Sequence, residues 1–147
     1  MKVIASGTFD HLHEGHHFFL EEAFKRGYVL IGLCSDDMTA HKPDAEKIYR
    51  YEKRKRDLKE YLASRGYTYK EDYIIRKIKD KIGFADDIKD IDAIIVTPEV
   101  RENADEINKI RREKGWRELQ IIEVPLLKDE KGVISSTRIR RFLKDLR

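Results

Sequence analysis

Five short apolar segments recur along the chain, and each has the composition of a strand buried in a β-sheet. The clearest covers residues 28–34, which are apolar or glycine throughout. Such a continuous run is expected of a strand that is covered on both faces. The pattern predicts strands over residues 2–6, 28–34, 72–78, 93–97 and 119–124.

Between these segments the apolar residues follow the spacing of an α-helix. The first set begins at His16 and ends at Gly27, which is a favourable residue just beyond a helix. The polar stretch 35–47 contains Pro43 and is expected to be a long loop. Further helices are predicted over 49–65, over 99–114 and from 135 or 136 onward, with one helical turn at 83–85 and a turn at 129–132.

Alternation of strands and helices indicates a parallel sheet with right-handed crossovers. The expected fold is therefore α/β: a single Rossmann-like, doubly wound domain over residues 1–147 with a five-stranded parallel sheet. The chain has no internal repeat, low-complexity tract or linker. Folds of this kind bind ligands at the carboxyl ends of their strands.

The composition of the chain argues against several classes of protein. Charged residues make up 40% of the chain, and 31 Lys and Arg against 28 Asp and Glu give a net charge of +3. Because the two signs are interspersed, an ion-paired surface is expected rather than a nucleic-acid patch. No segment approaches the ~20 apolar residues of a membrane span, and the apolar run at the start is too short for a signal peptide. Cys34 is the single cysteine, which excludes an internal disulfide and favours the cytoplasm.

The segment from Gly7 to His16 carries the strongest chemical signal. Its sequence, Gly-Thr-Phe-Asp-His-Leu-His-Glu-Gly-His, lies between the first expected strand and the first helix. A turn that leads into a helix offers N–H groups and partial positive charge to a phosphate. His13 and His16 can point at one phosphate, and Gly15 lets the backbone approach it. We interpret the turn as a nucleotide α-phosphate site; the alternative is a histidine-rich helix start with His16 or His17 packed on the helix.

A second candidate anion site lies near the other end of the chain. Ser135, Ser136 and Thr137 precede the last expected helix, and Arg140 can reach the same anion from one turn later. Taken alone, this pattern favours a helix N-cap followed by a solvated basic face. Together with the first turn it indicates a triphosphate held at two points along the strand ends.

The two motifs resemble the His-x-Gly-His and Ile-Ser-Ser-Thr-x-x-Arg signatures of the nucleotidyltransferase superfamily. Within it, the chain is most similar to the phosphopantetheine adenylyltransferases of archaeal type. Supporting stretches are Lys42-Pro43, residues 51–54, 94–99 and 133–140. The resemblance implies transfer of an adenylyl group from ATP to 4′-phosphopantetheine, which yields dephospho-CoA and pyrophosphate. It also implies Mg²⁺ that arrives with ATP, with no resident protein metal, and we expect a monomer.

The resemblance further assigns roles to individual residues. The implied catalytic residues are His13, His16, Lys42 and Arg140. The implied ATP-binding residues are Gly7, Thr8, Phe9, Asp10, Gly15, His16, Glu99, Ser135, Ser136 and Thr137. The implied acceptor-binding residues are Thr8, Lys42 and Arg101. Bacterial relatives carry an Arg-Gly-Leu-Arg-like stretch after the fourth strand, where this chain has Thr97-Pro98-Glu99-Val100-Arg101. Arg101 is included as a partial substitute for those arginines, with Arg111 or Arg112 on the next helix as the alternatives.

Other functions remain open at this point. FAD synthetases, cytidylyltransferases and NMN adenylyltransferases have similar signatures and differ in base and acceptor pockets, which no short motif describes. From a different class, the chain could be a non-catalytic nucleotide- or RNA-binding module. Tyr67, Tyr69 and Tyr73 alternate with charges, but they lack the aromatic signature of an RNA-binding sheet. A zinc site at the histidine-rich turn would need three or four ligands in closed geometry, for which the chain offers few partners.

Overall fold

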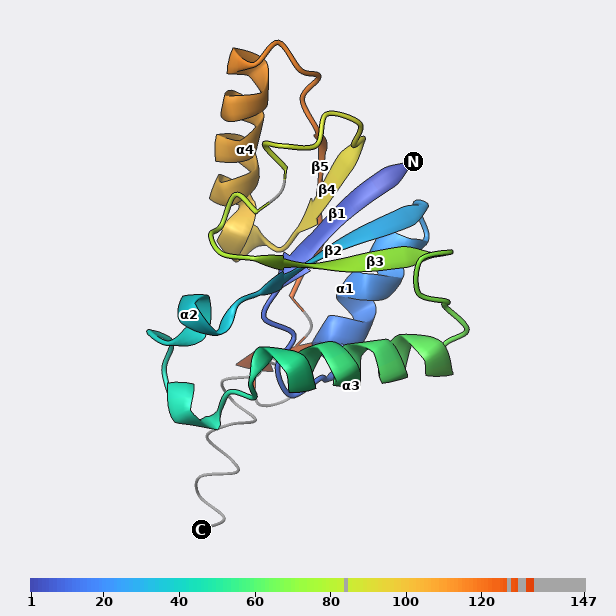
Figure 1. Cartoon of the computed structure of the whole chain (residues 1–147), viewed down its shortest axis with the longest axis vertical. Helices are drawn as coiled ribbons and strands as arrows, with labels where there is room; N and C mark the ends of the chain where they lie inside the picture. The colour runs from blue at the N-terminus through green and yellow to red at the C-terminus, as the bar shows by residue number, and fades with distance from the viewer. Residues whose placement is uncertain (84, 127, 130–131, 134–147) are drawn as a thin grey trace.

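The computed structural model describes residues 1–83, 85–126, 128–129 and 132–133. Five parallel strands form one sheet in the order β3-β2-β1-β4-β5 (Figure 1). This is the predicted five-stranded parallel sheet, and every predicted strand is present within two residues of its expected bounds. The strands are β1 (Lys2–Gly7), β2 (Tyr28–Cys34), β3 (Tyr73–Ile78), β4 (Ala93–Val96) and β5 (Gln120–Glu123).

Helices cover both faces of the sheet. α1 (Glu14–Phe24) and α3 (Tyr51–Ser64) lie on one face, and α4 (Arg101–Glu113) lies on the other (Figure 1). Successive strand residues point to opposite faces, so Val3 belongs to the core beneath α1 and α3 while Ile4 belongs to the core beneath α4. The strand order reverses between β1 and β4, and this switch point is where a ligand is expected.

The segment predicted as one long loop contains two short helical pieces. α2 (Asp36–Thr39) begins after Ser35, whose hydroxyl oxygen accepts a hydrogen bond from the Met38 N–H at 3.4 Å. A 3₁₀ helix, η1 (Ala45–Lys47), follows. The prediction missed α2 because four residues are too few to show helical periodicity.

The connection from β3 to β4 consists of bends, turns and irregular structure over its described residues, and Gly83 and Ala85 of the expected helical turn at 83–85 are assigned to turns. Arg111 of α4 holds this connection from inside the protein. Its fully buried guanidinium donates to the carbonyl oxygens of Ala85, Ile88 and Lys89 at 2.7, 2.8 and 2.7 Å. The side chain therefore supplies hydrogen-bond partners that a helix would otherwise provide internally.

The remaining predictions concern the chain beyond β4. The 3₁₀ helix η2 (Pro98–Val100) and α4 together match the helix predicted over 99–114. β6 (Lys128–Asp129) and β7 (Gly132–Val133) pair antiparallel on either side of the turn expected at 129–132, whose central residues 130–131 lie outside the described residues. The helix predicted from residue 135 or 136 onward lies outside the described residues. Across the described part of the chain, no helix is long and apolar enough to cross a membrane.

Candidate active site

A cavity of about 470 Å³ opens at the carboxyl ends of β1, β2 and β4, at the switch point of the sheet. The turn after β1 lines one side, and α4 with the β3–β4 connection lines the other. The structure thus gathers residues that are far apart in the sequence. Eight predicted site residues line the cavity: Gly7, Thr8, Phe9, Gly15, His13, His16, Lys42 and Glu99.

His13 and His16 form a capping box at the start of α1. The Nδ1 atom of His13 accepts a hydrogen bond from the Gly15 N–H at 3.0 Å, and the Nδ1 atom of His16 accepts one from the His13 N–H at 3.4 Å. The two rings stack with their centroids 3.9 Å apart. Because each Nδ1 atom accepts from the backbone, a neutral ring carries its proton on Nε2. The helix start therefore selects one tautomer for both histidines.

The charge state of His16 follows from its surroundings. Burial, together with the neighbouring His13 and His17, lowers the pKa of His16 to about 3. At neutral pH the ring is therefore uncharged and acts as a hydrogen-bond donor through Nε2. His17 lies differently, because its ring stacks on Tyr61 of α3 at a centroid distance of 4.1 Å. His17 is therefore the histidine that packs on the helix face, whereas His16 lines the cavity.

The turn between β1 and α1 is held in an unfavourable backbone conformation. Phe9 and His11 have φ values of 48° and 46°, in the left-handed region that residues other than glycine rarely adopt. Surrounding contacts enforce this shape, since Phe9 is buried in the core and His11 stacks on Tyr49. The turn is therefore shaped before any ligand binds.

Asp10 does not line the cavity. Its carboxylate is fully buried, and its Oδ1 atom accepts a hydrogen bond from the Tyr49 N–H at 3.0 Å. Its Oδ2 atom lies 3.5 Å from Nε2 of His11. Its position suits a residue that holds the turn in place, and the ATP contact inferred from the resemblance stays a prediction.

Arg101 is likewise outside the cavity lining. It is exposed at the start of α4 and pairs with Glu123 at 3.8 Å. The structure does not bring this predicted acceptor-binding residue to the cavity, because the first turn of α4 directs it toward β5. The predicted triphosphate residues Ser135, Ser136, Thr137 and Arg140 lie outside the described residues.

Several residues that line the cavity were not predicted from the sequence. The side of the cavity formed by α4 and the β3–β4 connection is mainly apolar, with one amide from Asn103 and one amine from Lys81. Their signal was weak, because isolated polar residues on a helix or in a loop are usually solvated. Cys34 also lines the cavity, and burial raises the pKa of its thiol, which keeps it in the unreactive protonated form.

The described site residues place hydrogen-bond donors at the cavity. The Nε2 donors of His13 and His16 and the start of a helix can stabilise negative charge that develops on a phosphate. Over the described residues, no group of three or more His, Cys, Asp or Glu side chains is arranged to hold a metal ion. The helix start and the imidazole donors therefore suit the binding of a phosphate group.

Comparison with known proteins gives the family. The model of the family described as "Cytidylyltransferase-like" matches residues 4–142. Phosphopantetheine adenylyltransferase of Thermococcus gammatolerans is 47% identical over 146 residues, which cover 98% of this chain and 90% of that protein. The enzyme of the same name from Thermococcus kodakarensis is 44% identical over 98% of this chain and 87% of its own length.

A solved structure agrees with these matches. The crystal structure of a protein of unknown function from Archaeoglobus fulgidus superposes with a TM-score of 0.73 at 34% identity, covering 84% of this chain and 89% of that one. The chain therefore belongs to the cytidylyltransferase-like family of nucleotidyltransferases and, within it, to the phosphopantetheine adenylyltransferase group.

Proposed function

We propose that this chain transfers the adenylyl group of ATP to 4′-phosphopantetheine, forming dephospho-CoA and pyrophosphate in coenzyme A biosynthesis. The observation that carries the proposal is the stacked pair His13 and His16, which lines the cavity at the switch point with each Nδ1 atom accepting from the backbone. Relatives that are 40% to 47% identical over nearly the whole chain carry this activity in their names.

The chemistry requires positioning and charge stabilisation. A phosphate oxygen of the acceptor attacks the α-phosphorus of ATP, a new P–O bond forms, and the bond to the oxygen that bridges the α- and β-phosphates breaks. Negative charge builds on the α-phosphate oxygens and on the bridging oxygen. The Nε2 hydrogens of His13 and His16 would donate to these oxygens, and pyrophosphate leaves.

Two further groups complete the proposed arrangement. Lys42 lines the cavity from the segment after β2 and would contact both phosphates as a point charge. Thr8 lies at the end of β1, where its hydroxyl and N–H would hold the acceptor phosphate. Mg²⁺ would enter with ATP, bound mainly by phosphate oxygens and water. We propose that the protein acts in the cytoplasm as a monomer, without a nucleic-acid or membrane partner.

The apolar side of the cavity supports pantetheine as the acceptor arm. Ile82, Ala85, Val100 and Ile107 line this side, and Asn103 contributes a single amide. The pantetheine arm is an uncharged chain with two amide groups, so it would bury its methylene groups here and exchange hydrogen bonds with Asn103. A flavin or a nucleoside would instead require several directed polar contacts.

An acceptor panel tests the proposal. The purified protein is incubated with ATP and Mg²⁺ together with 4′-phosphopantetheine, FMN or NMN, and with CTP and a phosphoalcohol. Pyrophosphate release and product mass are measured in each case. We expect release that depends on 4′-phosphopantetheine, with dephospho-CoA as the product. Release with one of the other acceptors alone would keep the nucleotidyl transfer and overturn the proposed substrate.

A further inference from the structure

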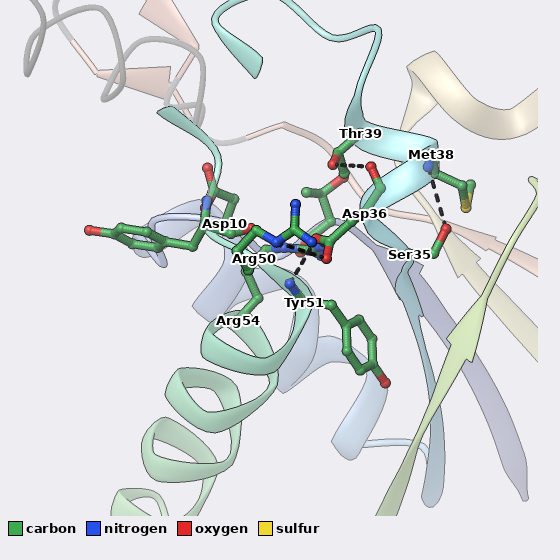
Figure 2. A network of polar contacts seen from close by, with 10 residues as sticks. Asp10, Ser35, Asp36, Met38, Thr39, Arg50, Tyr51 and Arg54 are labelled. Atoms are coloured by element: carbon green, nitrogen blue, oxygen red, sulfur yellow. Dashed lines mark hydrogen bonds and ion pairs between the residues drawn. The ribbon is translucent and has the colours of Figure 1, made fainter. Parts of the chain in front are cut away.

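A completely buried arginine lies behind the phosphate-binding turn, and the proposed reaction assigns it no role. Arg54, on the first turn of α3, has no exposed surface. Its guanidinium donates to the carbonyl oxygen of Thr8 at 2.9 Å, to the carbonyl oxygen of Tyr49 at 2.8 Å and to Oδ1 of Asp36 at 3.2 Å. Figure 2 shows the side chain at the centre of this network, with Asp36 and Arg50 beside it.

These acceptors come from two separate segments of the site. Thr8 belongs to the turn after β1, which carries the histidines. Asp36 and Tyr49 lie near the two ends of residues 35–50, the segment that carries Lys42. One planar guanidinium therefore connects the turn with both ends of the lysine segment. Arginine suits this role because its donors diverge within a plane, whereas a lysine ammonium is a compact point charge.

Two more hydrogen bonds cross the same boundary. The carboxylate of Asp10 accepts from the Tyr49 N–H, and the ring of His11 lies 2.9 Å from the Lys47 carbonyl oxygen at its Nε2 atom. The lysine segment is thus joined to the turn at its carboxyl end. At its amino end, Oδ1 of Asp36 accepts from Arg54 and from the Tyr51 N–H at 2.8 Å, and Arg54 links this carboxylate directly to the turn (Figure 2). Losing Arg54 would remove the direct hydrogen-bonded link between Asp36 and the Thr8 carbonyl oxygen.

Stability alone is a weak reason for this arrangement. Burial of a cation carries a large desolvation penalty, and buried charges are often replaceable by apolar residues without loss of stability. The Asp36 carboxylate, which also contacts Arg50 at 3.4 Å, offsets part of that penalty. What an apolar side chain could not reproduce is a fixed spacing between the Thr8 carbonyl and the segment of Lys42.

We infer that Arg54 is a positioning residue for adenylyl transfer, which sets the position of Lys42 relative to the turn of Thr8, His13 and His16. The inference rests on the proposed function. Because Arg54 acts through Lys42, removal of either residue should take away much of what the other contributes. Displacement of a reacting group by about 1 Å can lower a rate by about 100-fold.

A double-mutant cycle tests the inference. Formation of dephospho-CoA is measured for the wild type, Arg54→Lys, Lys42→Ala and the double variant. We expect Arg54→Lys to lower kcat/KM by about 100-fold in the wild type and by about tenfold or less in the Lys42→Ala background. Arg111→Lys is the matched control, since it alters an equally buried arginine beneath the opposite face of the sheet. Its effect should combine with that of Lys42→Ala within about twofold of additivity.

A second variant covers the case in which Arg54→Lys fails to fold. Asp36→Asn removes the carboxylate charge at a half-exposed position and leaves both carbonyl acceptors of Arg54 in place. It should lower kcat/KM by a smaller factor that again shrinks in the Lys42→Ala background. Additive effects of Arg54→Lys or Asp36→Asn with Lys42→Ala would overturn the inference and leave the proposed function intact. A wild-type protein that forms no dephospho-CoA would overturn the proposed function and this inference together.

Discussion

Among the residues that the structure describes, two arginines are completely buried, and they have different roles on opposite faces of the sheet. Arg54 on α3 joins two segments that line the cavity and has a carboxylate partner, Asp36. Arg111 on α4 donates to the backbone carbonyl oxygens of Ala85, Ile88, Lys89 and Arg117. Burial, with Arg117 nearby, lowers the pKa of Arg111.

The difference shows how one residue type meets two requirements. On the α3 side, the guanidinium fixes the position of groups that contact the phosphates in the proposed reaction. On the α4 side, it donates hydrogen bonds to carbonyl oxygens of the β3–β4 connection, whose described residues form no helix. Changes near Arg54 should therefore act on turnover, and changes near Arg111 should act mainly on the free energy of unfolding.

The largest effect is expected from His16→Ala. Loss of one donor to charge that develops in the transition state lowers kcat by about 10²–10³, while the KM for ATP changes little because His16 acts in the transition state. Steady-state kinetics with both substrates measures this. His17→Ala is the control, since that ring stacks on Tyr61. Near-normal turnover of His16→Ala would refute its catalytic role.

On the other face of the sheet, Arg111→Met should act on stability. It leaves buried carbonyl oxygens of the β3–β4 connection without donors, and we expect a loss of about 3 kcal/mol in the free energy of unfolding. Urea denaturation at neutral pH measures the change. If the variant kept wild-type stability, the connection would not depend on this side chain.

The pH dependence of stability isolates the environment of His16. The ring stays neutral in the folded protein down to a pKa of about 3, whereas it takes up a proton near pH 6.5 when unfolded. The unfolded state therefore binds more protons between these values, and stability falls as pH decreases through that window. His16→Gln should show a smaller loss of unfolding free energy from about pH 7 to about pH 4.5. Equal losses in the two proteins would contradict a buried neutral imidazole.

Arg101→Ala should have the smallest effect. Its partner Glu123 is 3.8 Å away and both side chains are largely exposed. We expect the free energy of unfolding to change by less than about 0.5 kcal/mol and the KM for the acceptor to stay within about twofold. A large rise in that KM would show that Arg101 contributes to acceptor binding, as the resemblance implies.

The two arginines also show where sequence reasoning succeeds and where it stops. The strands and the histidine turn were predictable, because long apolar runs and a motif at a strand end are local signals. Arg54 occupies a position in the buried stripe of α3, four residues before Leu58, and Arg111 stands four residues after Ile107 in that of α4. A cation at a core position was the available signal, but its partners are backbone atoms of distant segments, which no local pattern specifies.

The placement of Arg101 was less predictable for a similar reason. A motif fixes which residues follow β4, but the direction of a side chain on the first turn of α4 depends on how that helix packs. The tautomers of His13 and His16 likewise depend on cap geometry that appears only when the helix is built.

The most direct test of the central claim follows the α-phosphate. The wild-type protein is incubated with ATP that is labelled at the α-phosphorus, Mg²⁺ and 4′-phosphopantetheine, and the products are separated and weighed. Adenylyl transfer predicts that the label enters dephospho-CoA and that the pyrophosphate released is unlabelled. Label that remains in ADP or AMP, with no labelled dephospho-CoA, would contradict it.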